Sequence, residues 1–250
     1  MRKIFFSLFI LVALWSCSTT VDTTSFSAEE HLQYAQKLAA EGDYEVAVRE
    51  FQSILLQYAG SPVNDDAQYF LGITYAKREQ YLLAAYEFSK LIRDIPASEF
   101  VQDAQFMLAD SYYQQSPNFQ LEQSYTKKAV EEFQAFIEFF PTHPKVSEAE
   151  KKIQELNHKF AQKEFHNAEI YERMEYYNAA IKYFTQVYET YHDTEFAPKA
   201  LYRKIMLLVE KDRVDESLRS IADYIEKYPK NDKVEELEKI KTEMEAEFNG

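Results

Sequence analysis

Small and large apolar residues recur along the chain in a fixed order. Five small residues each stand four positions before a large apolar residue, in the pairs Ala47/Phe51, Ala84/Phe88, Ala129/Phe133, Ala180/Phe184 and Ser217/Ile221. Residues four apart lie on one face of a helix. A small residue there lets a neighbouring helix approach, and the large one fills the space beside it. The pattern therefore predicts five helices, each packed closely on a partner.

A second set of mostly small residues lies upstream and predicts the partner helices. Its members are Ala35, Gly72, Ala109, Ala168 and Ile205, and a Leu or Tyr follows each of them by three residues. Units often end at a proline, as in Phe140-Pro141 and Tyr228-Pro229, because proline cannot continue a helix. Two such helices in succession form a helix-turn-helix repeat.

The spacing of these repeats defines the expected architecture. The small residues that begin the five pairs are 37, 45, 51 and 37 residues apart, against a period of about 34 in tetratricopeptide (TPR) repeats. An insertion around Ser116-Pro117-Asn118 and a long first helix in the fourth repeat, roughly 147–173, explain the two larger values. We predict an all-α, TPR-like α-solenoid of five helix-turn-helix repeats plus a C-terminal capping helix. The expected bounds are about 28–61, 65–98, 102–143, 147–194 and 198–231, with the capping helix at about 233–248.

The first residues indicate export and a lipid anchor. Arg2 and Lys3 precede an apolar run over 4–15, which is shorter than the roughly 20 residues that span a bilayer and is typical of a secretory signal peptide. The run ends in Leu14-Trp15-Ser16-Cys17, which resembles a bacterial lipobox. We expect a signal peptide over 1–16, a tether over 17–26 lipidated at Cys17, and the repeat domain over 27–250. The alternative is an ordinary signal peptide with an incidental cysteine.

Charge and cysteine content exclude several classes of function. The formal net charge is −14, so phosphate backbones would be repelled and nucleic acid is not an expected partner. Anionic lipid would be repelled too, so attachment to a membrane has to be covalent or through a partner. Cys17 is the only cysteine, which excludes an internal disulfide and a zinc–cysteine cluster.

No arrangement of residues points to catalysis. The five histidines form no H-E-x-x-H motif, and the chain contains neither a G-x-G-x-x-G nor a G-x-S-x-G sequence. The carboxylates are scattered along predicted solvent-facing helix surfaces. We therefore expect a binding protein that is not an enzyme and that has no metal or cofactor.

A row of apolar and aromatic residues is the candidate binding surface. Leu32, Tyr69, Phe106, Phe165 and Tyr202 each stand three residues before the small residue of a first helix, and first helices line the concave face of a TPR superhelix. Exposed rings suit an extended peptide because they bury a large area at a small entropic cost. The alternative is that these rings only fill gaps between repeats. The predicted peptide-binding residues are Leu32, Tyr69, Ile73, Lys77, Phe106, Asp110 and Tyr113, and those predicted for partner docking are Phe165 and Tyr202.

The uneven repeat rhythm resembles that of the BamD (YfiO) family of lipoproteins. The resemblance extends from Ser27 to about Pro229 and includes the lipobox. Two stretches carry most of it. The first is Gln123–Phe133 with Thr126 and Ala129, and the second contains Phe160, Ala161, Glu164, Ala168 and Tyr171.

The resemblance implies a non-catalytic scaffold of the outer-membrane β-barrel protein assembly machine. It implies that the N-terminal repeats bind unfolded outer-membrane proteins and that the C-terminal repeats dock on the periplasmic domains of a BamA-like barrel insertase. Other lipoproteins of the same complex are further candidate partners. The expected location is the outer membrane, lipid-anchored and facing the periplasm, and Ser18 after the cysteine, in place of Asp, favours that membrane. The alternative is another periplasmic TPR lipoprotein adaptor, pilotin-like or Tol-Pal-associated, a group whose repeats tend to be evenly spaced.

The lipid anchor can be tested at its single attachment atom. Cys17→Ala removes the sulfur that would take the acyl chains, so we expect the protein to leave the outer-membrane fraction or to accumulate as an unprocessed precursor. Cell fractionation with acyl labelling measures this. A variant that stays membrane-bound and labelled would show that the lipobox interpretation is wrong.

Overall fold

The computed structural model describes residues 22–248, so the predicted leader and Cys17 lie outside the described residues. The described part is all-helical and has no strand. Its helices are α1 (Ala28–Glu41), α2 (Tyr44–Gln57), α3 (Asn64–Lys77), α4 (Tyr81–Asp94), α5 (Val101–Gln114), α6 (Ser124–Phe139), α7 (Val146–Arg173), α8 (Tyr177–Thr190), α9 (Phe196–Glu210), α10 (Val214–Lys227) and α11 (Val234–Phe248).

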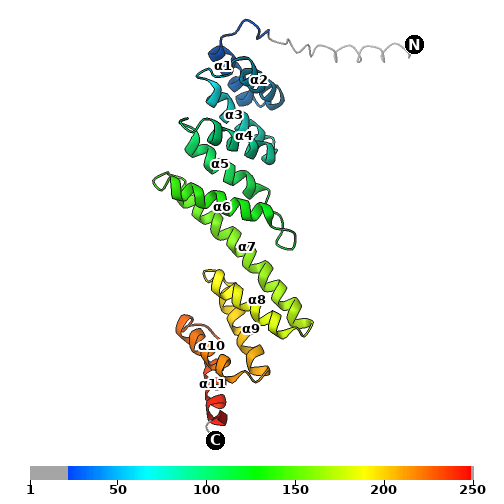
Figure 1. The fold of residues 1–250 in the computed structure, drawn as a ribbon, viewed down its shortest axis with the longest axis vertical. Coiled ribbons are helices and arrows are strands. Elements are labelled where there is room, and N and C mark those ends of the chain that lie inside the picture. Colours follow the sequence, from blue (N-terminus) through cyan, green and yellow to red (C-terminus); the bar gives the residue numbers. More distant parts are fainter. Residues whose placement is uncertain (1–21, 249–250) are drawn as a thin grey trace, which may run out of the picture.

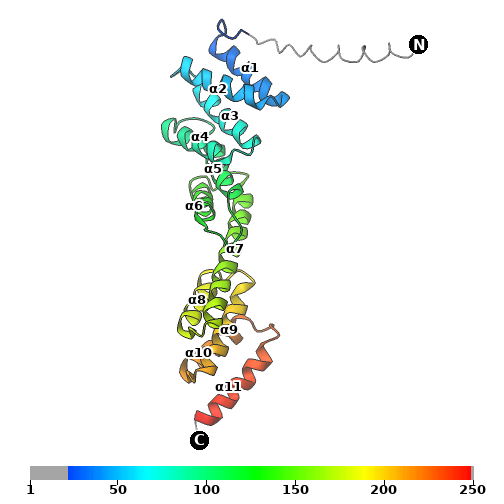
Figure 2. The same cartoon turned by 90° about the vertical axis from the view of Figure 1, so that its right-hand side faces the viewer.

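The helices form antiparallel pairs that stack into an elongated solenoid (Figures 1 and 2). Each helix packs mainly on its neighbours in the chain, and first helices of successive pairs also meet, α1 with α3 and α7 with α9. The turns within pairs lie along one edge of the solenoid, and the connections between pairs lie along the other (Figure 1). The predicted TPR-like α-solenoid is confirmed.

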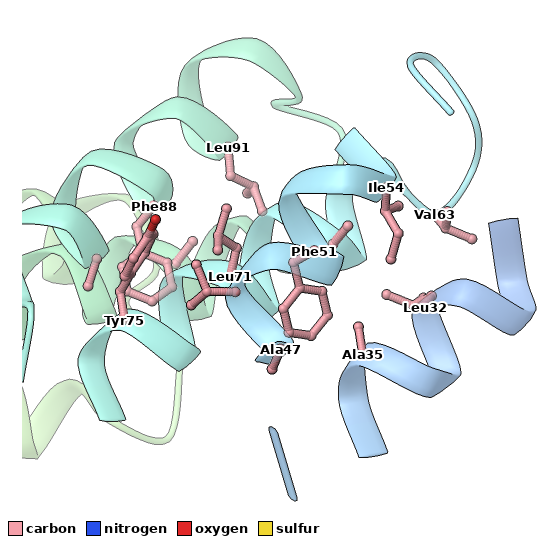
Figure 3. Close-up of a cluster of buried hydrophobic side chains, with 14 of the residues drawn as sticks. Leu32, Ala35, Ala47, Phe51, Ile54, Val63, Leu71, Tyr75, Phe88 and Leu91 are labelled. Carbon is pink, nitrogen blue, oxygen red and sulfur yellow. The ribbon is translucent and has the colours of Figure 1, made fainter. Parts of the chain in front are cut away.

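Close packing within each pair depends on the small residues. Both members of all five predicted small/large pairs are fully buried. Gly72 of α3 marks the closest approach, because a Cβ atom there would lie 2.7 Å from Cε1 of Phe88 on α4. Figure 3 shows Phe88 in the first buried cluster with Leu71, Tyr75 and Leu91. Helix faces that carry large side chains at these positions could not come so near to each other.

Short turns within the pairs end the first helices abruptly. Gly42 ends α1 with a φ of 90°, and its N–H donates to the carbonyls of Leu38 and Ala39. The equivalent turns place Glu79, Glu175 and Asp212 at φ values of 58°, 62° and 51°. This left-handed conformation reverses the chain within two or three residues, which keeps the second helix directly against the first.

The long helix α7 belongs to two units of the stack. Its first half closes a buried cluster with α5 and α6, which includes Phe133 and Leu156. Its second half opens the C-terminal cluster through Ala161 and Ala168, which pack with α8. The inserted loop between α5 and α6 is held against α7, where the Lys163 amine donates to the carbonyl oxygen of Leu121 at 2.7 Å. A single rigid helix therefore joins the N-terminal and C-terminal halves.

None of the described helices has the length and apolarity required to cross a membrane.

The register of the repeats can be tested by overpacking one small site. Ala129 is fully buried in α6, so Ala129→Phe should destabilise the fold by ~1–3 kcal/mol and lower the melting temperature. Ala40→Phe is the matched control, because Ala40 is an exposed residue of α1. Circular dichroism melting of both variants makes the comparison, and equal melting temperatures would contradict the packing described here.

Candidate functional site

The predicted row of rings lies at the junctions between repeats. In each case the first residue of the next helix in the row, or the residue directly before it, covers the ring or side chain of the preceding one. Phe100 stacks on Tyr69 with centroids 4.6 Å apart, the Lys145 amine lies 4.7 Å from the Phe106 ring centre, and Lys233 lies 5.0 Å from that of Tyr202. Two further junctions have the same arrangement, with Phe196 against Phe165 at 5.5 Å and Val63 in one buried cluster with Leu32.

Two members of the row are too buried to meet a peptide. Leu32 is 8% exposed and Phe106 is 4% exposed, so the expectation that they form an exposed row is wrong. Helical periodicity predicted that these residues share one face of the first helices. At Leu32 and Phe106, however, the next repeat packs over that face. Phe106 packs edge-on to Phe133 and Phe136 of α6 at 5.6 and 5.4 Å. Its role in the described fold is to hold α5, α6 and α7 together.

Tyr69 is half-buried between repeats. Burial, with a smaller contribution from nearby Asp103, raises the pKa of its hydroxyl to about 12. The ring stacks on Phe100 and also lies 5.9 Å from Phe88. Ile73, one turn further along α3, packs against the first cluster, and Lys77 at the end of α3 is exposed. Of the predicted residues on α3, Lys77 is therefore the one most available to a ligand.

Asp110 and Tyr113 of α5 are tied to α7. The Lys152 amine lies 2.7 Å from the Asp110 carboxylate and 4.2 Å from the Tyr113 ring centre. The Tyr113 hydroxyl donates to Glu155, and this hydrogen bond, with burial, raises the pKa of Tyr113 to about 12. The group fixes α5 against the first half of α7 and leaves Tyr113 partly accessible.

Phe165 and Tyr202, the predicted docking residues, come together in one groove of about 490 Å³. We call it the C-terminal groove. It lies between α7, α9 and the connection from α10 to α11, and its exposed surface is mostly apolar. The lining residues are Phe165, Glu195, Pro198, Lys199, Tyr202, Arg203, Tyr224, Asn231, Asp232 and Lys233.

Three cations surround the aromatic residues of this groove. Lys199 and Arg203 stand four apart on one face of α9, and Lys233 precedes α11. Arg203 pairs with Glu172 of α7, and Lys199 pairs with Glu195 at 2.8 Å. Burial raises the pKa of Tyr224 to about 12, and burial with a hydrogen bond to Glu236 raises the pKa of Tyr202. Both phenols therefore stay neutral, and the charge of the groove lining comes from these three cations and from the carboxylates of Glu195 and Asp232.

Sequence reasoning missed Lys199, Arg203 and Tyr224. The i,i+4 spacing of the two cations beside Tyr202 is a visible signal of one shared helix face. Tyr224 of α10 and Lys233 line the groove because the repeats pack on one another. No local pattern in the sequence indicates this packing.

A second, more polar cleft of about 630 Å³ lies between α7 and the connection from α8 to α9. Glu155, Asp193 and Glu195 line it, together with His158, whose Nε2 lies 3.2 Å from Glu195. Within residues 22–248, no group of three or more His, Cys, Asp or Glu side chains is placed to hold a metal ion.

Comparisons with known proteins identify relatives over most of the chain. The family model YfiO, described as an outer membrane lipoprotein, matches residues 26–208. The outer membrane protein assembly factor BamD of Vibrio cholerae serotype O1 is 23% identical over 205 residues, which cover 78% of this chain and 85% of that protein. BamD of Rickettsia prowazekii is 26% identical over 200 residues, which cover 79% of this chain and 80% of that protein.

Solved TPR structures also match this chain, and the two described next have TM-scores below 0.5. The TPR domain of P58(IPK) is 14% identical, with a TM-score of 0.45, covering 82% of this chain and 52% of that one. A thermophilic TPR protein of Thermus thermophilus is 17% identical, with a TM-score of 0.37, covering 87% of this chain and 98% of that one. The fold assignment therefore rests on the helix pairs of this chain.

Stability measurements can separate packing residues from ligand-binding residues in the predicted row. Phe106→Ala removes a buried ring and should cost ~3–5 kcal/mol, whereas Lys77→Ala at an exposed helix end should change stability by less than ~0.5 kcal/mol. Denaturant unfolding followed by circular dichroism measures both. A Phe106→Ala variant as stable as Lys77→Ala would mean that the ring does not connect α5 to α6 and α7.

Proposed function

The chain belongs to the YfiO family of outer membrane lipoproteins, and from that premise we propose that it is a non-catalytic scaffold of outer-membrane protein assembly. In this proposal it is anchored through Cys17 and faces the periplasm. Its C-terminal repeats dock on the periplasmic domains of a BamA-like barrel insertase, and its N-terminal repeats receive unfolded barrel proteins. The observation that carries the proposal is the C-terminal groove, considered together with the family match over residues 26–208.

The chemistry of the C-terminal groove suits a partner protein. Its apolar surface and aromatic side chains offer area for hydrophobic contact, and aromatic and Arg residues are enriched at the centres of protein interfaces. Lys199, Arg203 and Lys233 outnumber the two carboxylates that line the groove, Glu195 and Asp232, in a chain whose net charge is −14. The complementary partner segment is apolar and carries at least one carboxylate, which Arg203 can bind with two parallel hydrogen bonds.

Carboxylates already bound to these cations do not prevent docking. Glu195 is exposed and holds Lys199 from the rim of the groove. An exposed pair of this kind contributes little to stability, so an incoming carboxylate can replace it at small cost. Glu172, in contrast, is largely covered and orients Arg203 from α7.

The N-terminal repeats offer a different surface for extended substrates. Lys77 is exposed at the end of α3, and Tyr69 of α3 and Tyr113 of α5 are partly accessible. Unfolded barrel proteins present alternating apolar and polar side chains, which would meet these rings and the lysine in turn. Leu32 and Phe106 do not belong to this surface, because both are buried in the core of the N-terminal repeats.

Charge reversal in the groove tests the docking proposal. Arginine anchors at an interface centre contribute ~2 kcal/mol or more, roughly a thirty-fold change in affinity, so Arg203→Glu should weaken binding to the purified periplasmic domains of the insertase by at least that factor. Lys182→Glu is the matched control, because Lys182 is an exposed cation of α8 that does not line the groove. Isothermal titration calorimetry measures both affinities.

Equal affinities for the two variants would contradict docking through the groove. If neither variant nor the native chain binds the insertase, but the native chain co-purifies with a secretin or with Tol-Pal components, the alternative adaptor functions replace the proposal. Melting temperatures equal to that of the native chain are required before either variant is interpreted.

A further inference from the structure

The segment that leads into α1 is fixed to the first repeat. The Tyr58 hydroxyl at the end of α2 donates to the carbonyl oxygen of Phe26 at 2.8 Å. The Phe26 ring packs edge-on to His31 and Tyr34 of α1, with centroids 6.2 and 5.9 Å away. A capping box between Ser27 and Glu30 then begins the helix. The chain that comes from Cys17 therefore reaches the solenoid beside the C-terminal end of α2.

The chain segment at this point is uncharged. Residues 51–64 contain no Asp, Glu, Lys or Arg, although charged residues make up 28% of the chain. Leu56 on the last turn of α2 is 82% exposed, the largest exposure among the exposed large apolar side chains of the described residues. Ala59, Gly60 and Pro62 follow it as exposed residues of the connection to α3. We call this surface, residues 56–62, the α2–α3 shoulder.

Corresponding connections in the C-terminal half differ in charge. The connection from α8 to α9 contains Asp193 and Glu195, and the one from α10 to α11 contains Lys230, Asp232 and Lys233. All of these connections lie on the same edge of the solenoid as the shoulder (Figure 1). The absence of charge is therefore a local property of the shoulder and is not a general property of the connections.

The length of the tether limits how far the shoulder can lie from the lipid. Phe26 stands nine positions after Cys17, and an extended chain spans at most ~3.3–3.6 Å per position, or roughly 30 Å in total. The turn in which the Phe26 N–H donates to the Thr23 carbonyl shortens this reach. An acyl chain on Cys17 would consequently hold the first repeat at the membrane surface.

We propose that the α2–α3 shoulder lies in the headgroup layer of the membrane that holds the anchor, with the Leu56 side chain inserted into the lipid. This inference rests on the anchor at Cys17 in the proposed function. Lipid is the expected occupant because the tether emerges at the shoulder. Residues 56–62 carry no charge that would have to lose its hydration and none that anionic headgroups would repel.

The experiment supplies the anchor chemically, so that it does not depend on lipidation in the cell. The chain from Cys17 onward is coupled through the thiol of its single cysteine to maleimide-bearing lipid in phosphatidylcholine vesicles. The only tryptophan of the sequence is Trp15, upstream of Cys17. Leu56→Trp therefore introduces a single tryptophan at the shoulder, whose emission is excited selectively over that of the tyrosines at long wavelength. Leu82→Trp is the matched control, because Leu82 is a 45% exposed leucine at the start of α4, on the opposite edge.

In Leu56→Trp we expect the emission to shift to shorter wavelength and to lose intensity when the vesicles contain brominated phosphatidylcholine. In Leu82→Trp both quantities should match those of the uncoupled protein. The quenching should persist at about 1 M salt, where the Debye length is ~3 Å, because no charge is involved. Circular dichroism melting verifies that both variants fold.

Water-like, unquenched emission from Leu56→Trp would overturn the proposal, and so would equal quenching of the two variants. Either result would leave the lipid anchor itself to be judged by the Cys17→Ala experiment.

Discussion

The contact on which the structure depends is the one between each helix pair and the first helix of the next pair. A single helix pair cannot bury its apolar face, so each repeat is stable only when the next one covers it. In this chain residues at the N-terminal end of the following first helix contribute to that cover, as Phe100 does for Tyr69 and Lys145 for Phe106. The small residues within each pair, such as Gly72 beside Phe88, bring the helices near enough for this contact to form.

This constraint decides which residues remain for binding. Rings that hold repeats together are removed from the concave surface, so recognition depends on side chains at its margins and on places where the regular stacking changes. The principal change is α7, whose 28 residues serve two units of the stack. Beyond it, the C-terminal groove combines apolar area with three cations. At the other end, the uncharged shoulder adjoins the incoming tether. The two ends of one scaffold thus have different surface chemistry, which suits a protein that joins a membrane to a partner.

Much of the fold could be predicted from the sequence, because the pairing of small and large residues four apart is a local signal. The helix expected at roughly 147–173 corresponds to α7 at 146–173. The candidate site could be predicted only in part. Phe165 and Tyr202 do share a groove, but periodicity could not reveal that Phe106 is covered, since Lys145 lies 39 residues further along the chain and reaches the ring through tertiary packing. The contribution of Tyr224 and Lys233 to the groove also depends on the superhelical bend.

Depletion of the protein from growing cells tests the central claim, that this scaffold serves the assembly of outer-membrane barrels as a class. The measurement is the amount of folded barrel proteins in the outer membrane, determined from the heat-modifiable mobility of several unrelated barrels before growth slows. The account predicts that all of them fall together, while lipoproteins without barrels keep their levels. Normal levels of folded barrels after depletion, or the loss of only one secretin or one transport system, would contradict it.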